Sequence, residues 1–243
     1  MPGAPIRALF FDLDDTLLDD TESSEHAAEA VVRELAAQRG LDPVAVARSY
    51  IEAAVDFWEE LVPGDPKPPS GAIRPSIWRK ALARHGVEDA ALATKIARRY
   101  DAARLERVEL FPETLPVLHQ LHGRYKLAII TNGFAETHEA KIARLELSRF
   151  FDVIVLAGEM QLVKPDPSVF RHALEAAQAS AQESVMVGDR YERDIVGAHA
   201  AGLRAIWINV RNEELAAGAR VPEAVIRSIA ELPAALATLE QAS

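Results

Sequence analysis

The 243-residue chain contains no cysteine. This absence excludes disulfides, thiolate zinc sites and cysteine nucleophiles. It suits a reducing compartment, so we expect a cytoplasmic location. No stretch approaches about 18 uninterrupted apolar residues, which argues against a transmembrane span and a membrane partner. The first ten residues hold one arginine and no long apolar run, so they do not resemble a signal peptide.

The chain is also short of positive charge. Its 27 Lys and Arg residues stand against 37 Asp and Glu residues, a net charge of −10. Proteins that bind nucleic acid polymers are more often basic, so we expect no such partner. Nearly half of the residues, 49%, are hydrophobic, which provides a sizeable core. The length suits one large domain, or a core domain with a smaller second one.

Short apolar runs predict a parallel sheet. The stretch "IRALFFDLD", residues 6–14, is typical of a buried strand because it is short, apolar and ends in polar residues. Four later runs have the same form, and amphipathic helical patterns lie between the later ones. This alternation predicts an α/β fold with a doubly wound parallel sheet. The other expected strands are 126–133, 152–158, 184–189 and 204–209, and the expected helices are 136–147, 166–178 and 191–202.

One long segment breaks the alternation. Residues 19–108 are alanine-rich and show helical patterns without a convincing strand. We therefore predict a core domain made of residues 1–18 and 109–243, with a helical domain, 19–108, inserted after the first strand. The helices expected in the insert are 26–38, 44–61, 76–86 and 90–108, with a proline- and glycine-rich loop at 62–75.

Polar side chains follow the ends of several predicted strands. In an open parallel sheet, ligands bind outside the carboxyl ends of the strands, so these side chains are expected at one edge. They comprise carboxylates, a hydroxyl, an amide and a cation. The residues expected there are Asp12, Asp14, Thr131, Asn132, Lys164, Asp189 and Asp194.

This set of side chains suits phosphoryl chemistry. In an extended chain Asp12 and Asp14 point the same way, roughly 7 Å apart. Together with Asp189 they supply carboxylates without histidine, which suits a hard cation such as Mg²⁺. Thr131 and Lys164 can hold phosphate oxygens. A carboxylate such as that of Asp12 can accept a phosphoryl group and form an aspartyl-phosphate.

The same stretches resemble a known family. "DLDDT", the threonine of "IITNG", the lysine of "VKPD" and the two acids of "GDRYERD" resemble, in order, the four motifs of the haloacid dehalogenase superfamily. The resemblance covers nearly the whole chain, and the insert is similar to the cap of type C1 members. It implies a Rossmann-like core with an inserted all-helical cap domain.

The resemblance implies a role for each motif residue. Asp12 would be the nucleophile, and Asp14 the general acid that protonates the leaving oxygen and then the base that activates water. Thr131, Asn132 and Lys164 would bind the substrate phosphate.

It also implies a cofactor, Mg²⁺. The ion would be held by the carboxylate of Asp12, the backbone carbonyl of Asp14 and Asp189, and Asp194 would be a supporting residue.

Asp14 also favours one reaction over others. Haloacid dehalogenases resemble one another in lacking an acid two residues after the nucleophile, so Asp14 indicates hydrolysis of phosphate esters. The motifs "TNG" and "KPDPSVF" are similar to those of small-molecule phosphatases such as acylneuraminate-9-phosphatases and pyrimidine nucleotidases. The expected substrate is a small phosphorylated metabolite, a sugar phosphate or a nucleotide. The alternatives are a 2-haloacid dehalogenase-type hydrolase and a non-catalytic binding protein on the same fold.

The insert offers candidates for substrate specificity. Trp58, Arg74, Trp78 and Arg79 carry rings or charges suited to a leaving group, although core packing is expected of at least one tryptophan. Six histidines lie on helical stretches without the spacing of metal ligands, and we interpret them as structural or surface residues. They are His85, His119, His122, His138, His172 and His199.

Overall fold

The computed structural model describes residues 4–59, 70–158, 160 and 163–241. The chain divides into two compact units. The core unit comprises Met1–Asp19 and Leu110–Ser243, and the helical unit comprises Asp20–Glu109. None of the helices in the described ranges is long and apolar enough to cross a membrane.

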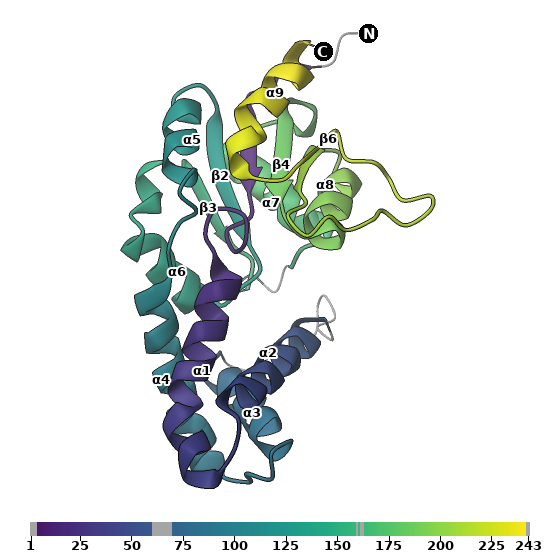
Figure 1. Ribbon diagram of the computed structural model, residues 1–243. Coiled ribbons are helices and arrows are strands. Elements are labelled where there is room, and N and C mark those ends of the chain that lie inside the picture. The colour runs from purple at the N-terminus through teal and green to yellow at the C-terminus, as the bar shows by residue number, and fades with distance from the viewer. Residues whose placement is uncertain (1–3, 60–69, 159, 161–162, 242–243) are drawn as a thin grey trace. The chain divides into compact units, whose positions relative to one another are not determined.

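The core unit contains a six-stranded parallel sheet (Figure 1). The strand order is β3-β2-β1-β4-β5-β6, which confirms the predicted doubly wound α/β fold. The sequence did not predict β6. The strands are β1 Ala8–Phe11, β2 Lys126–Thr131, β3 Val153–Leu156, β4 Ser184–Gly188, β5 Arg204–Ile208 and β6 Ala224–Ile226.

Strand β1 lies in the middle of the sheet, between β2 and β4. Phe10 aligns with Ala128 of β2 and Met186 of β4, and all of these side chains are buried. A strand that is buried on both faces needs apolar side chains at every position, and β1 has the sequence "ALFF". The chain leaves β1 toward β2 on one side and reaches β4 on the other, so the switch point of the winding, where such folds bind ligands, lies beside the end of β1.

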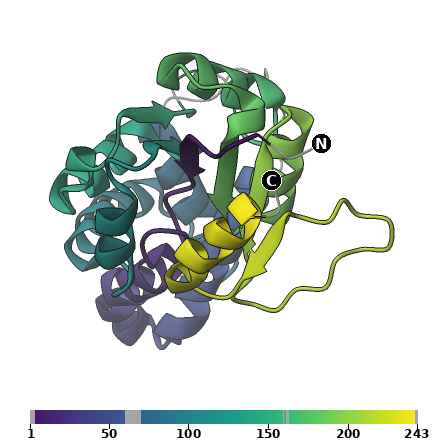
Figure 2. The same ribbon diagram turned by 90° about the horizontal axis from the view of Figure 1, so that it is seen from above.

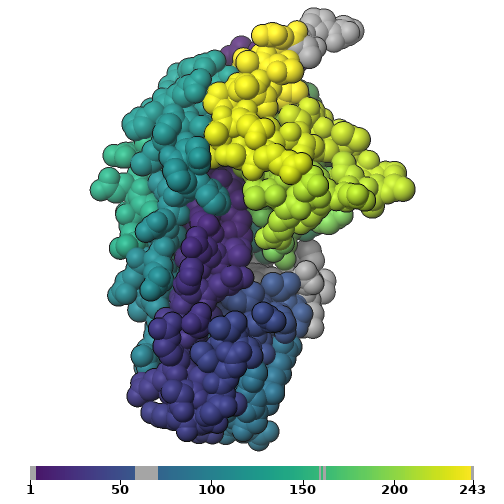
Figure 3. All heavy atoms as spheres, in the orientation of Figure 1, coloured from purple at the N-terminus to yellow at the C-terminus, as the bar shows by residue number. Residues whose placement is uncertain are grey.

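Helices cover both faces of this sheet (Figure 2). Helices α5 and α9 contact each other, as do α7 and α8. In the space-filling view, α9 (yellow) lies on the outside of the core unit (Figure 3). The helices are α5 Thr114–Leu121, α6 Ala135–Arg144, α7 Pro167–Ala177, α8 Gly197–Ala200, which continues a π-helical turn Tyr191–Val196, and α9 Leu232–Gln241.

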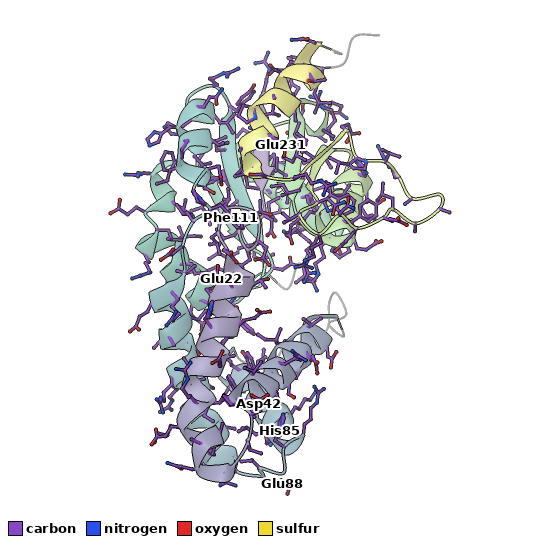
Figure 4. The ribbon with its side chains drawn as sticks, viewed as in Figure 1. Glu22, Asp42, His85, Glu88, Phe111 and Glu231 are labelled. Atoms are coloured by element: carbon purple, nitrogen blue, oxygen red, sulfur yellow. The ribbon has the colours of Figure 1, made fainter. Side chains whose placement is uncertain are left out.

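The helical unit contains α1 Asp20–Arg39, α2 Pro43–Glu59, α3 Ser70–Ala83 and α4 Ala90–Arg107. His85 and Glu88, labelled in Figure 4, lie between α3 and α4. The expected loop 62–75 was wrong in its last part, because α3 already begins at Ser70; the rest of it lies outside the described residues. Pro75 lies inside this helix, where its missing N–H removes one backbone hydrogen bond.

An aromatic cluster forms the core of the helical unit. The ring of Trp78 stacks on Tyr50 with centroids 4.0 Å apart, and Tyr100 meets both rings. Arg74 lies beside them: its guanidinium is 5.2 Å from the Tyr100 centroid and donates to the Tyr50 hydroxyl at 3.1 Å. Its charge is balanced by Asp101, with Nε 2.5 Å from Oδ1.

Replacing Trp78 by alanine is expected to lower the free energy of unfolding by about 3–5 kcal/mol, because it removes a fully buried ring and leaves a cavity. Urea unfolding of the whole chain measures this change. Arg79→Ala is the matched control on the same helix, because Arg79 is exposed and its loss should change stability by no more than about 0.5 kcal/mol. Equal effects of the two substitutions would contradict this account of the helical core.

Candidate active site

A buried ion-pair network lies where β1 ends. Lys164 Nζ donates to Asp12 Oδ1 at 2.7 Å and to Asp194 Oδ1 at 2.6 Å. Asp194 is held in turn by the backbone N–H of Arg190, 3.0 Å from its Oδ2. All three side chains of the network are buried. The structure therefore brings together residues from three separate motifs of the sequence.

Asn132 fixes the segment that carries Lys164. Its Nδ2 donates to the carbonyl of Lys164 at 2.9 Å, and its Oδ1 accepts from the backbone N–H of Lys164 at 2.7 Å. This paired bond orients the lysine, and the contact of Asn132 with phosphate stays a prediction. Thr131, the last residue of β2, is buried at the same edge of the sheet, and its carbonyl accepts from Ala157.

Three carboxylates come close enough together to hold one cation. Oxygen atoms of Asp12, Asp189 and Asp194 all lie within 4.8 Å of one another. Oδ1 of Asp189 is buried and bonds to no group in the part of the chain that the structure describes. Buried polar atoms normally have a partner, so this oxygen marks a position that a ligand would complete.

The electrostatics of the cluster also favour a cation. Burial raises the pKa of Asp12 to about 6, although Lys164 opposes this effect. Burial, together with Asp12, Asp194 and Asp15, raises the pKa of Asp189 to about 8. Carboxylates with such raised pKa values are unfavourable as anions, and a bound divalent cation would stabilise them.

The cation of the network remains charged. Burial lowers the pKa of the Lys164 ammonium, but Asp12 and Asp194 raise it by more, so the net shift is upward. Oδ1 of Asp12 therefore bonds to a positively charged ammonium group, that of Lys164. A lysine in this position can hold a phosphate oxygen beside the Asp12 carboxylate.

Asp14 points to a different set of partners. Its Oδ1 accepts from Lys141 Nζ at 2.7 Å, and its Oδ2 lies 3.0 Å from His138 Nε2. Both partners come from α6 and are buried, at 1% and 3% exposure. The interpretation of His138 as merely structural or surface-exposed missed this contact, and Lys141 attracted no prediction.

The specificity candidates of the helical unit have different environments. Trp78 is fully buried in the aromatic cluster, and the guanidinium of Arg74 is engaged by Tyr50 and Asp101. These two side chains therefore stabilise the unit, and their contact with a leaving group stays a prediction. Arg79 is exposed, and the side chain of Trp58 lies outside the described residues.

A family model of haloacid dehalogenase-like hydrolases matches residues 6–202, and this range includes every motif residue of the site. The chain belongs to this family. Its motif order, its doubly wound sheet and the buried network at the end of β1 agree with that membership.

Proteins with assigned activities resemble this hydrolase over most of its length. N-acylneuraminate-9-phosphatase of Mus musculus is 29% identical over 97% of this chain and 95% of its own. Phosphoserine phosphatase of Thermus thermophilus is 31% identical over 84% of this chain and 89% of its own. Both names describe hydrolysis of phosphate esters by those proteins.

Solved structures of the family share the fold. The HAD-hydrolase YfnB of Bacillus subtilis superposes with a TM-score of 0.82 at 23% identity, covering 96% of this chain and 100% of that one. A 2-haloacid dehalogenase of Pseudomonas syringae pv. Tomato has a TM-score of 0.68 at 34% identity, covering 96% and 99%. The family therefore includes relatives named for two different reactions.

Proposed function

We propose that this hydrolase is a Mg²⁺-dependent phosphatase that cleaves phosphate monoesters of small metabolites through an aspartyl-phosphate on Asp12. The proposal rests on one observation: Asp12 and Asp14, which follow β1, bond to different partners. Asp12 pairs with Lys164 in the buried network, while Asp14 bonds to α6. The two phosphatase relatives support the same reaction.

Asp12 is placed for the transfer step. Its Oδ1 is held by Lys164, so its orientation is fixed and its other oxygen can attack phosphorus. Lys164 also offers positive charge to the phosphate oxygens, which lessens repulsion between the phosphate and the carboxylate. Water would then cleave the acyl phosphate and regenerate Asp12.

Asp14 supplies and removes the protons. Its carboxyl group is partly exposed, at 27% of the side chain, so it remains accessible to substrate and water. As an acid it protonates the leaving oxygen of the ester, and as a base it takes a proton from the attacking water. A single side chain can serve both half-reactions because the first leaves it in the form that the second requires.

The residues fit a hard divalent cation. The carboxylates of Asp12 and Asp189 would hold it together with the backbone carbonyl of Asp14, and Asp194 would support the site. Oxygen ligands without histidine favour Mg²⁺. When bound, the ion supplies positive charge that stabilises the anionic carboxylates and the transferring phosphate.

Replacing Asp189 by Asn should raise the Mg²⁺ concentration needed for half-maximal activity by at least about tenfold, because a ligand loses its charge. Magnesium titrations of phosphate release measure the change. Glu192→Gln is a matched control, since Glu192 is exposed on the turn that carries buried Asp194. Full activity of the wild type in excess chelator would refute the metal site.

A second candidate reaction is hydrolytic dehalogenation of 2-haloacids. The dehalogenase of Pseudomonas syringae, 34% identical to this chain, favours it. Asp14 argues against it, because displacement of halide needs no proton for the leaving group. A non-catalytic protein on this fold would not need Asp12, Lys164 and Asp189 to remain together.

One screen separates these possibilities. Purified protein is incubated with a panel of phosphate monoesters, including sugar phosphates and nucleotides, and with 2-haloacids, each with and without Mg²⁺. Phosphate release that requires Mg²⁺ supports the proposal. Halide release without phosphate release would establish the second candidate, and no release from either panel would favour a binding protein.

A further inference from the structure

Two side chains of α6 hold the carboxylate that the proposed reaction uses for proton transfer. His138 and Lys141 lie three positions apart, so they share one face of the helix. Each contacts a different oxygen of Asp14: Nε2 of His138 lies 3.0 Å from Oδ2, and Nζ of Lys141 lies 2.7 Å from Oδ1. Contact at both oxygens restricts rotation of the carboxyl group as well as of the side chain.

The burial of the two side chains shows that the contact belongs to the interior of the core unit. Lys141 is 1% exposed and His138 is 3% exposed. Burying an ammonium group is costly unless a charged or polar partner compensates, and Asp14 provides that compensation. A charge-assisted bond of this kind is shorter and stronger than a neutral one.

The ring of His138 is itself fixed on both sides. Its Nδ1 lies 2.9 Å from the carbonyl of Phe134; because a carbonyl only accepts, Nδ1 donates and Nε2 is directed to Asp14. The ring also lies against Gly133, where an added Cβ would be only 1.5 Å from the ring atom Cε1. The glycine of "TNG" therefore leaves room for the ring.

The connection to the phosphate-binding segment follows from chain order. Strand β2 ends at Thr131, and helix α6 begins at Ala135 after a short turn that contains Asn132. The segment that would bind the phosphate thus continues into the helix that orients Asp14. Displacement of α6 would alter both together.

We propose that His138 and Lys141 are positioning residues that hold the Asp14 carboxyl group where it exchanges protons with the leaving group and with water. The inference rests on the proposed phosphatase function. A group misplaced by about 1 Å can lose roughly a hundredfold in rate, so the orientation of Asp14 matters to the reaction.

Kinetics of single variants test this role. Lys141→Met and His138→Leu should lower kcat on an alkyl phosphate by roughly tenfold to a hundredfold. On p-nitrophenyl phosphate, whose leaving group barely needs a proton, they should lower the rate of the first turnover less. His138→Gln keeps a polar group that can bond to Asp14 and should retain more activity than His138→Leu. Glu139→Gln, on the exposed face of the same helix, is the control that should match the wild type.

A double-variant comparison separates positioning from general stabilisation. In an Asp14→Asn background, Lys141→Met should cause little further loss, because the carboxylate that it orients has already been replaced. Equal losses in the first-turnover rate on alkyl and aryl phosphates, or the same loss with and without Asp14→Asn, would overturn the proposal.

A spectroscopic measurement tests the contact without any activity. The Lys141 ammonium signal in ¹H–¹⁵N spectra should be protected from solvent exchange in the wild type and weakened in Asp14→Asn, but retained in Asp12→Asn. A signal that is insensitive to Asp14→Asn would refute the positioning role. If no phosphate ester is hydrolysed while this pattern holds, the proposed function fails and the contact stands.

Discussion

Replacing Asp12 by Asn is expected to abolish hydrolysis of alkyl and aryl phosphates alike. The substitution keeps the shape of the side chain but removes the charged oxygen that attacks phosphorus. Both esters need the nucleophile for their first step. A more acidic leaving alcohol should therefore not restore the rate. The measurement is kcat for phosphate release from one alkyl and one aryl ester at saturating Mg²⁺.

Asp15→Asn is the matched control for this variant. Asp15 belongs to the same loop, and its positive φ of 56° is one that Asn adopts readily. It should therefore fold like the wild type and retain activity, because Asp15 acts on Asp189 only through its charge. Phosphate release by Asp12→Asn at a rate near that of Asp15→Asn would contradict the assignment of Asp12 as nucleophile.

Replacing Asp14 by Asn should lower kcat on alkyl phosphates by at least about a hundredfold, within the range of 10²–10⁴ typical of general acid–base groups. Such a loss corresponds to about 3–5 kcal/mol of activation free energy. An alkoxide is a poor leaving group without a proton, and the attacking water also loses its base. Both the transfer of the phosphoryl group to Asp12 and its hydrolysis are therefore slowed.

The loss in the rate of the first turnover should be smaller on p-nitrophenyl phosphate. The aryl leaving group departs without protonation, so only the breakdown of the acyl phosphate is slowed. A rapid burst of nitrophenolate followed by slow turnover is the expected time course. An Asp14→Asn enzyme with normal rates on an alkyl phosphate would end the acid–base assignment.

The sheet was predictable where burial makes the sequence pattern strong. Strand β1 is buried along its whole length and reads as a continuous apolar run. Strand β6 is different: it has only three residues, and Val225 at its centre is 49% exposed. A short edge strand of this kind leaves no apolar pattern, so the sequence did not reveal it.

The start of α3 escaped prediction for a related reason. Proline and glycine near Ser70 favour a loop in a local reading, but the aromatic contacts of Trp78 with Tyr50 and Tyr100 stabilise the helix. Such packing of residues distant in sequence overrides local propensity.

The site could be predicted in part from the ends of the strands. Placing Asp12, Lys164 and Asp194 at one edge follows from the rule for parallel sheets, and the structure brings them into contact. The partners of Asp14 could not be found in this way, because His138 is 124 positions away and its contact depends on the rotation of α6. The available signal was a pair of polar side chains three positions apart on a helix directly after "TNG".

The most direct test of the central claim is to trap the phosphoryl group on Asp12. The Asp14→Asn variant is mixed with Mg²⁺ and p-nitrophenyl phosphate, quenched in acid during the burst, digested and analysed by mass spectrometry. Formation of the acyl phosphate needs no acid with this substrate, whereas its breakdown lacks a base, so the intermediate should accumulate. We predict one phosphoryl group on the peptide that contains Asp12, located on that residue. A burst of nitrophenolate with an unmodified Asp12, or with the phosphoryl group on another residue, would contradict the account.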